Sequence, residues 1–231
     1  MNTDIKNVII FASNNKGKAK ELYKCLREFN IILLSEIKEL DNFIIEESEN
    51  TFEANALKKA EAISKVTDTA VIADDSGLCI DAFDGWPGVT TKRWLEGTDR
   101  ERNLAILEKM KGLSYKQRGC SYVSSVVLKK DDKTILKSTC ELRGHIAYDV
   151  RGKKGFGFDE IFVLPNGKTL AELEFSEKQA VNPRTKALQN IRYQVTLWNY
   201  PLRILGYRHS AKQQAIEKIN ARVEEYNNNK L

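Results

Sequence analysis

A short polar segment near the N-terminus has the residue types of a phosphate-binding loop. Residues 13–18 read Ser-Asn-Asn-Lys-Gly-Lys and stand between an apolar run at 7–12 and a helix-like stretch at 17–29. Small polar residues and a glycine let backbone N–H groups point outward, and the N-terminal end of the helix adds positive charge. The segment lacks the spacing of a P-loop. An ordinary strand–helix turn with solvated lysines is the alternative.

A pair of adjacent carboxylates follows a predicted strand at 70–73. These are Asp74 and Asp75, with Ser76 and a glycine after them. Ligand sites of α/β proteins lie at the carboxyl ends of strands, and adjacent carboxylates repel unless a cation or a proton lies between them. Magnesium with a phosphate substrate would meet that need. An Asx-turn is the structural alternative.

A second acidic pair precedes the next helix. Glu46 and Glu47 stand upstream of Asn55 and Lys59, which are four residues apart and therefore lie on one helical face. The acidic pair could share a magnesium ion with Asp75, while Lys59 could balance phosphate charge. The alternative is a solvated run of charges.

Two aromatic residues alternate with glycines at 155–159, which read Gly-Phe-Gly-Phe-Asp. Aromatic faces stack on nucleobases, with about 1–3 kcal/mol per base. The adjacent Asp159 could accept hydrogen bonds from ring N–H groups. The alternative is that Phe156 and Phe158 are both core residues.

Two cations lie six residues apart near the end of the chain. Lys178 and Arg184 flank a segment in which Pro183 follows Asn182. Proline ends one helix or starts the next, so both cations could point into one cleft. Ordinary surface charge is the alternative.

Alternating strands and helices must position these residues. Strands are predicted at 7–12, 31–34 and 70–73, with a hairpin of strands at 120–129 and 133–143. Helices are predicted at 17–29, 51–66, 100–111, 176–181, 184–197 and 211–226. Early alternation combined with a central hairpin predicts an α/β protein with a mixed sheet.

Composition narrows the classes of function. The chain has 231 residues, 42% of them hydrophobic, with 37 basic and 32 acidic side chains and a net charge of +5. That length suits one medium domain or two small lobes. The apolar runs are far shorter than the roughly 20 residues of a membrane span, and no signal peptide is expected. Basic and acidic residues are interleaved, which argues against nucleic-acid binding.

The cysteine and histidine content argues against zinc. The four cysteines form no C-x-x-C pair, and there are only two histidines. Any metal should therefore be a hard cation held by carboxylates. Scattered cysteines in a chain of this size also favour a reducing cytosol.

The order of these motifs resembles the inosine triphosphate pyrophosphatase family over about residues 7–197. The resemblance rests on Ser-Asn-Asn-Lys-Gly-Lys, Thr-Phe-(x)₂-Asn-Ala-Leu-Lys-Lys-Ala, Ile-Ala-Asp-Asp-Ser-Gly-Leu, Gly-Trp-Pro-Gly, Gly-Phe-Gly-Phe-Asp-(x)-Ile-Phe and Glu-Lys-(x)₅-Arg-(x)₂-Ala-Leu. It implies Mg²⁺-dependent hydrolysis of non-standard purine nucleoside triphosphates (ITP, dITP, XTP) to the monophosphate and pyrophosphate. It also implies a two-lobed α/β fold with a long central mixed sheet flanked by helices, an active-site cleft between the lobes, and a homodimer.

The resemblance also implies roles for individual residues. The triphosphate would bind Ser13, Asn14, Asn15, Lys16, Gly17, Lys18 and Lys59. Asp75 would accept the proton, would hold magnesium with Glu46 or Glu47, and would have Ser76 beside it to contact the substrate. The base would pack on Phe156, Gly157 and Phe158, with Asp159 on its polar edge. Lys178, Asn182 and Arg184 would close over the base and phosphates.

Departures from the family pattern leave two other hypotheses open. The family usually has Ser-His-Arg where this chain has Asn182, Pro183 and Arg184. In the family, the histidine helps to recognise the keto oxygen of the purine, and Pro183 offers no donor in its place. Losing one buried donor typically costs about 1–3 kcal/mol, so the same chemistry could act on a different nucleotide. The chain could also be a nucleotide-binding regulator without turnover. We expect a single two-lobed domain at 1–205 and a helical extension at 206–231.

Overall fold

The computed structural model describes residues 8–27, 29–40, 43, 45–131, 135–197 and 209–229. Its sheet has the order β2-β1-β3-β4-β5-β6, with strands β1 (Ile9–Phe11), β2 (Ile31–Leu33), β3 (Ala70–Ile80), β4 (Gly119–Lys129), β5 (Ile135–Ile146) and β6 (Phe162–Val163). The helices are α1 (Lys16–Cys25), α2 (Phe52–Thr67), α3 (Asp99–Lys109), α4 (Phe175–Val181), α5 (Pro183–Leu197) and α6 (His209–Asn228). Three predicted elements include positions outside the described residues: Asn7 in the strand at 7–12, Glu28 in the helix at 17–29, and 133–134 in the strand at 133–143.

The sheet is mixed, as the sequence predicts. Strand β1 is parallel to both neighbours, pairing Ile9 with Ile31 of β2 and with Ala70 of β3. At the other end of the sheet, β5 is antiparallel to β6 and pairs His145 with Val163. Parallel neighbours need a crossover of a dozen or more residues, which α1 and α2 help to supply. The α/β prediction with a mixed sheet flanked by helices is therefore confirmed.

The prediction that the third strand ends at Ala73 is wrong. Strand β3 continues through Asp74, Asp75 and the following Ser-Gly to Ile80. Strand β1 pairs with β3 only as far as Ile72, and the other neighbour of β3 in the sheet is the long strand β4. The two buried carboxylates are accommodated because lysine ammonium groups lie near them. The acid pair consequently lies within a strand, where neither residue forms an Asx-turn.

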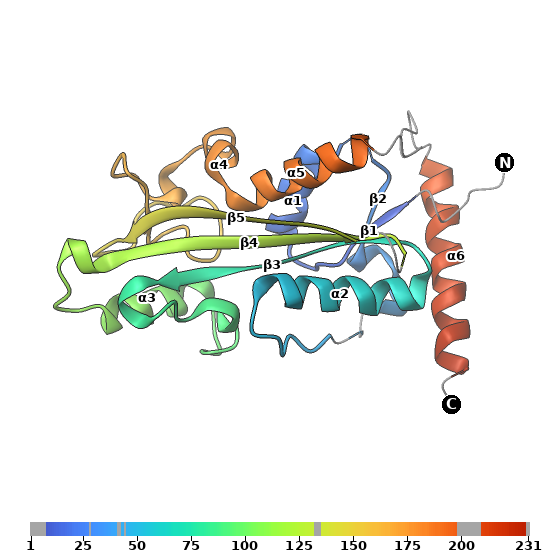
Figure 1. Cartoon of the computed structure of the whole chain (residues 1–231), viewed down its shortest axis with the longest axis horizontal. Helices are drawn as coiled ribbons and strands as arrows, with labels where there is room; N and C mark the ends of the chain where they lie inside the picture. Colours follow the sequence, from blue (N-terminus) through green and yellow to red (C-terminus); the bar gives the residue numbers. More distant parts are fainter. Residues whose placement is uncertain are drawn as a thin grey trace. The chain divides into compact units, whose positions relative to one another are not determined.

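The chain forms two compact units, and the first comprises residues 1–75, 125–138 and 187–231. In this unit α2 lies on one side of the strands, and α1 and α5 lie on the other (Figure 1). Side chains of β1, β2, β3 and α2 share one apolar core with α6. Helix α6 contributes Ala215, Ile219 and Val223, which are fully buried.

The second unit comprises residues 76–124 and 139–186. Within it, α3 and α4 lie on opposite sides of the strands (Figure 1). Its apolar core includes Ile106 and Met110 from the α3 segment, and Phe158, Ile161 and Phe162 from the chain before and in β6. This core supports the loop that carries the two aromatic residues.

Local capping explains where the main helices begin. Thr51 caps α2 by accepting a hydrogen bond from the Ala54 N–H at 3.1 Å, and Thr98 caps α3 in a capping box with Glu101. Pro183 opens α5, where its missing N–H costs no helical hydrogen bond. Among the residues that the structure describes, no helix combines the length and apolar character needed to cross a membrane.

Candidate active site

The segment at 13–18 forms the turn into α1. The side chain of Asn15 caps this helix by accepting a hydrogen bond from the Lys18 N–H at 3.1 Å. The Ser13 hydroxyl in turn accepts a hydrogen bond from the Asn15 N–H at 3.3 Å. Both side chains therefore shape the start of the helix, where exposed backbone N–H groups favour an anion.

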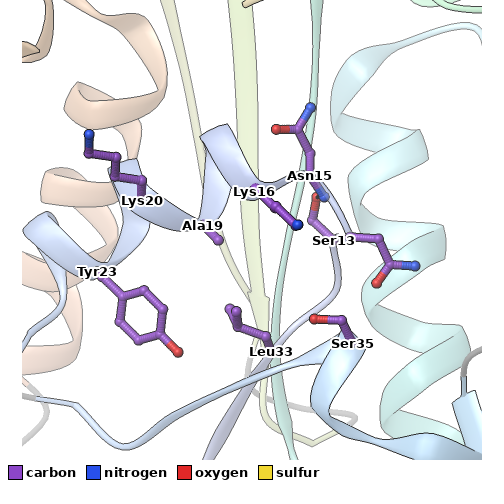
Figure 2. Close-up of a pocket in the computed structure, with 9 residues that line it drawn as sticks. Ser13, Asn15, Lys16, Ala19, Lys20, Tyr23, Leu33 and Ser35 are labelled. Atoms are coloured by element: carbon purple, nitrogen blue, oxygen red, sulfur yellow. Dashed lines mark hydrogen bonds between the residues drawn. The ribbon is translucent and has the colours of Figure 1, made fainter. Parts of the chain in front are cut away.

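A pocket of about 370 Å³ opens beside this turn (Figure 2). The 13–18 segment contributes four residues to its wall, and the rest come from α1, the end of β2 and the 3-10 turn at Leu34–Glu36. The lining residues are Ser13, Asn14, Asn15, Lys16, Ala19, Lys20, Tyr23, Leu33 and Ser35. Lys16 projects from the first turn of α1 toward the hollow, and Ser35 lies across from it (Figure 2). Four of the six predicted phosphate-loop residues thus share one cavity.

Lys18 lies on a different side of the loop from this pocket. Its ammonium forms an ion pair with Oδ2 of Asp74 at 2.8 Å. Asp74 is 1% exposed, so the pair is shielded from water and is screened little by salt. The two lysines of the loop therefore have different neighbours: Lys18 contacts strand β3, and Lys16 lines the pocket.

The buried Asp75 lies in an arrangement of alternating charge. The Lys59 ammonium lies 2.8 Å from Oε1 of Glu47 and 3.8 Å from Oδ1 of Asp75. Burial raises the pKa of Asp75 above the ordinary aspartate value; Lys59 and Lys18 oppose this rise, while Glu47 and Asp74 add to it. Such a carboxylate binds a proton more readily than an exposed one, as a proton acceptor must.

Lys59 stays charged in this environment. Burial by itself would lower the pKa of Lys59, but the charges of Asp75, Asp74 and Glu47 outweigh burial and raise it. A permanently charged ammonium next to two carboxylates also provides positive charge for an incoming phosphate.

Asn55 is a site residue to which sequence reasoning gave no role. It is fully buried, and its Nδ2 donates to Oδ2 of Asp75 at 3.1 Å and to the Glu49 carbonyl at 3.3 Å. Its Oδ1 accepts from the Glu49 N–H at 3.0 Å. The available signal was its spacing of four residues from Lys59 on one helical face.

Of the two predicted magnesium ligands before α2, Glu47 faces the buried charges and Glu46 is exposed to solvent. In the described part of the chain, no three His, Cys, Asp or Glu side chains gather into a metal cluster. Magnesium usually binds one or two protein carboxylates and completes its shell with substrate phosphates and water. Two hard oxygen donors, from Glu47 and Asp75, fit that requirement.

In the second unit, two cations lie over one aromatic ring. Phe156 is half-buried, with the Lys178 ammonium 4.4 Å and the Arg184 guanidinium 5.9 Å from its ring centroid. Lys178 also forms a buried ion pair of 2.6 Å with Oδ2 of Asp159. That same oxygen accepts a hydrogen bond from the Phe156 N–H at 2.8 Å. Asp159 therefore joins the backbone of the aromatic loop to the cation above its ring.

The predicted contact of Phe158 with a base needs correction. Phe158 is 5% exposed and belongs to the apolar core with Ile161 and Phe162. A ring enclosed by core side chains has no free face for a base. Of the two aromatic residues in the loop, only Phe156 keeps an accessible surface.

The segment before α5 is also ordered by polar contacts. Oδ1 of Asn182 accepts from the Arg184 N–H at 2.8 Å and from the Thr185 N–H at 3.4 Å. Arg184 is 1% exposed, and its Nη2 donates to the Ser76 hydroxyl at 2.7 Å. Ser76 follows Asp75 in β3 and belongs to the second unit, as Arg184 does.

Two polar residues of α3 also contact the aromatic loop, and sequence reasoning missed both. Oδ2 of Asp99 accepts from the Gly157 N–H at 2.7 Å, and Nδ2 of Asn103 donates to the Gly157 carbonyl at 3.0 Å. The only signal in the sequence was that Asp99 directly follows the capping Thr98 and that Asn103 lies four residues later, on the same helical face.

The chain matches a known protein family along most of its length. A profile of the Ham1 family matches residues 9–194. The dITP/XTP pyrophosphatase of Symbiobacterium thermophilum is 39% identical over 184 residues, covering 78% of this chain and 90% of that protein. The dITP/XTP pyrophosphatase of Bacillus subtilis is 37% identical over 187 residues, covering 79% and 93%. A HAM1 protein from Coxiella burnetii has a similar structure, with a TM-score of 0.73 and 35% identity over 82% of this chain and 98% of that one.

Proposed function

Since the chain belongs to the Ham1 family, we propose that it hydrolyses nucleoside triphosphates to the monophosphate and pyrophosphate. Its substrates would be non-standard purine nucleotides (ITP, dITP and XTP), in keeping with the names of the relatives. The observation that carries this proposal is the set formed by the buried Asp75, Lys59 and Asn55 with the partly exposed Glu47. These side chains supply a proton acceptor, a cation for phosphate and oxygen donors for a metal.

In this mechanism Asp75 orients and deprotonates the water that attacks the α-phosphorus. Asn55 fixes one carboxylate oxygen through its 3.1 Å hydrogen bond, which aims the other oxygen. Lys59 and the loop lysines, Lys16 and Lys18, offset the charge of the leaving pyrophosphate. Phosphoryl transfer depends mainly on positioning and charge neutralisation, and these residues provide both.

Magnesium would be held by Glu47 and Asp75, and when bound it supplies further neutralisation of the triphosphate charge. Of the predicted pair, we favour Glu47 because it faces the buried Lys59, whereas Glu46 is exposed. Chelation of divalent cations should therefore abolish turnover, and added Mg²⁺ should restore it.

In the second unit the base would lie against Phe156, with Lys178 and Arg184 near the same ring. Base–aromatic stacking tolerates any base because every base has a π-face. Selection among bases must therefore come from polar groups near the ring. Arg184 and Lys178 supply donors, which suit the keto oxygens of hypoxanthine and xanthine.

Pyrophosphate release across a nucleotide panel tests the proposal. The panel contains ITP, dITP, XTP, the four standard nucleoside triphosphates and their deoxy forms, each with Mg²⁺. Hydrolysis in ¹⁸O-labelled water identifies the phosphorus attacked. The label should appear in the monophosphate, as attack at the α-phosphorus requires. Label in pyrophosphate, or release of inorganic phosphate from the γ-position, would contradict the mechanism.

A second candidate function uses the same chemistry on a different nucleotide. Pro183 is buried at the start of α5 and offers neither an N–H nor a polar side chain. The Oδ1 of the preceding Asn182 is committed to capping that helix. Neither Pro183 nor the Asn182 Oδ1 therefore offers a donor to a base, and a flat nucleotide profile that Pro183→His turns toward ITP would favour this candidate.

The proposal also includes a homodimer that acts in the cytosol. Sedimentation of the purified chain tests the first part, because a single boundary at twice the mass of the chain is expected. If the chain sediments as a monomer at all concentrations and is fully active, the homodimer is not needed for the proposed function.

A further inference from the structure

Helix α3 carries two side chains that hold both backbone groups of one residue in the aromatic loop. Oδ2 of Asp99 accepts from the Gly157 N–H at 2.7 Å. Nδ2 of Asn103 donates to the Gly157 carbonyl at 3.0 Å. Asp99 and Asn103 are four residues apart, so they project from the same face of α3. Two hydrogen bonds from one rigid helix fix both the position and the orientation of this peptide segment.

The two side chains are themselves held in place. Asp99 is the first residue of α3, directly after the Thr98 cap, and its Oδ1 accepts from Arg102 at 2.8 Å. Asn103 is fully buried, and its amide also donates to Oε2 of Glu160 at 3.3 Å. These contacts leave each carboxylate or amide little freedom to turn away from Gly157.

Gly157 has a backbone conformation that depends on such support. Its φ is +64°, in the left-handed region that residues with a Cβ rarely adopt. Glycine is conformationally free, so the loop would sample other backbone angles unless external contacts selected one. The contacts from α3 make that selection.

The residue that depends on this selection is Phe156. Its N–H is held by Asp159 at 2.8 Å, and the next peptide group along the chain is held by Asp99. The half-buried ring of Phe156 lies beneath the Lys178 ammonium. Because Phe156 and Gly157 share a peptide bond, rotation at Gly157 would move the ring away from that cation.

We propose that Asp99 and Asn103 are positioning residues for base recognition: through Gly157 they hold the Phe156 ring where a purine base can stack on it. The inference rests on the proposed function and deepens it, because it assigns the affinity for the base partly to helix α3. Loss of either side chain should weaken binding of the base without altering the chemistry at Asp75.

The test compares Asp99→Ala and Asn103→Ala with Asp99→Asn and with Glu101→Ala. Asp99→Asn keeps an acceptor for the Gly157 N–H. Glu101→Ala removes the capping box with Thr98 at the start of the same helix, so it controls for general loosening of α3. Steady-state kinetics with ITP and XTP are measured for each variant. Inorganic tripolyphosphate, which lacks a base, serves as a competitive inhibitor.

Both alanine variants should raise KM for ITP and XTP about tenfold, the effect of losing much of one stacking contact. Their kcat and their inhibition constants for tripolyphosphate should stay within about twofold of wild type, as for a change remote from the reacting atoms. Asp99→Asn should recover most of the lost affinity, and Glu101→Ala should leave KM unchanged. An unchanged KM in both alanine variants, or parallel shifts in kcat, KM and tripolyphosphate inhibition, would overturn the proposal.

Amide hydrogen exchange at Gly157 gives a readout that does not require turnover. The Gly157 amide should be protected in the wild type and in Glu101→Ala, and should exchange faster in Asp99→Ala. Equal exchange in all three proteins would overturn the clamp even if the enzyme is active. If the wild type hydrolyses none of the nucleotides, the proposed function fails, while faster exchange in Asp99→Ala would still support the clamp as a structural element.

Discussion

The side chain of Asn55 donates a hydrogen bond of 3.1 Å to Oδ2 of Asp75, and both residues are buried. Asn55 also binds the backbone N–H and carbonyl of Glu49. One amide therefore connects Asp75 in β3 to the segment that carries the acidic pair before α2.

Replacing Asn55 tests this connection. A hydrogen bond to a charged group contributes about 1.5–3 kcal/mol, so Asn55→Ala should lower kcat roughly ten- to a hundredfold. Steady-state kinetics on ITP measure the loss. The matched control is Asn190→Ala, which removes an exposed amide that bonds Ser138 and should leave kcat unchanged. Equal kcat in the two variants at equal folded fraction would show that Asp75 is positioned without Asn55.

The pH dependence of turnover reports on the charges around Asp75. The base must be deprotonated to act, so kcat/KM should fall as the pH drops through its pKa. Burial raises that pKa, which places the acid limb above the ordinary aspartate value of about 3.9. Lys59 favours the charged carboxylate, so Lys59→Met should move the limb upward by about one pH unit or more.

Lys58→Met is the control for this shift. Lys58 is the neighbouring residue of α2, and its ammonium bonds Ser48 and Glu49 instead of Asp75. Its pH profile should keep the acid limb of the wild type. A limb that stays fixed, or moves downward, in Lys59→Met would contradict the electrostatic role of Lys59.

Helix α6 lies beyond the residues that the family profile matches, yet it belongs to the apolar core of the first unit. Ile219 is fully buried there. Ile219→Ala should lower the free energy of unfolding by about 2–5 kcal/mol, measured by urea denaturation. Glu217 is exposed on the same helix, and Glu217→Ala should change that free energy by about 0.5 kcal/mol or less. Matching denaturation curves for the two variants would mean that α6 does not stabilise this unit.

Local patterns predicted most of the elements. The apolar spacing and the Thr51 cap predict α2 within a residue of its bounds, because capping and burial on one face are local properties. The end of β3 was missed because Asp74 and Asp75 look like turn residues. Their place in a strand depends on Lys18 and Lys59, which are distant in sequence.

The sequence also predicted that Glu46 or Glu47 and Lys59 lie near Asp75, but it could not decide between similar neighbouring residues. Nothing local distinguishes Glu46 from Glu47, or Phe156 from Phe158. Those distinctions arise from which side chain faces Lys59 and which ring enters the core. The clamp of Asp99 and Asn103 on Gly157 joins residues more than fifty positions apart, and no pattern within either segment reveals it.

The stability of Asp75→Asn separates a functional carboxylate from a structural one. With a raised pKa, the folded state holds a proton on Asp75 at pH values where the unfolded state has lost it. The free energy of unfolding therefore falls as the pH rises from the ordinary aspartate pKa to the raised one. The amide introduced by the substitution cannot ionise, so the variant should melt at neutral pH no lower than the wild type.

Turnover by that same variant shows whether Asp75 is the general base. Pyrophosphate release from ITP and XTP with Mg²⁺ is measured for wild type and Asp75→Asn at neutral pH. We predict clear release by the wild type and a loss of roughly a hundredfold or more in the variant, since general-base catalysis contributes about 10²–10⁴-fold. If a folded Asp75→Asn variant keeps activity within about tenfold of wild type, the loss is smaller than general-base catalysis requires, and Asp75 is not the general base.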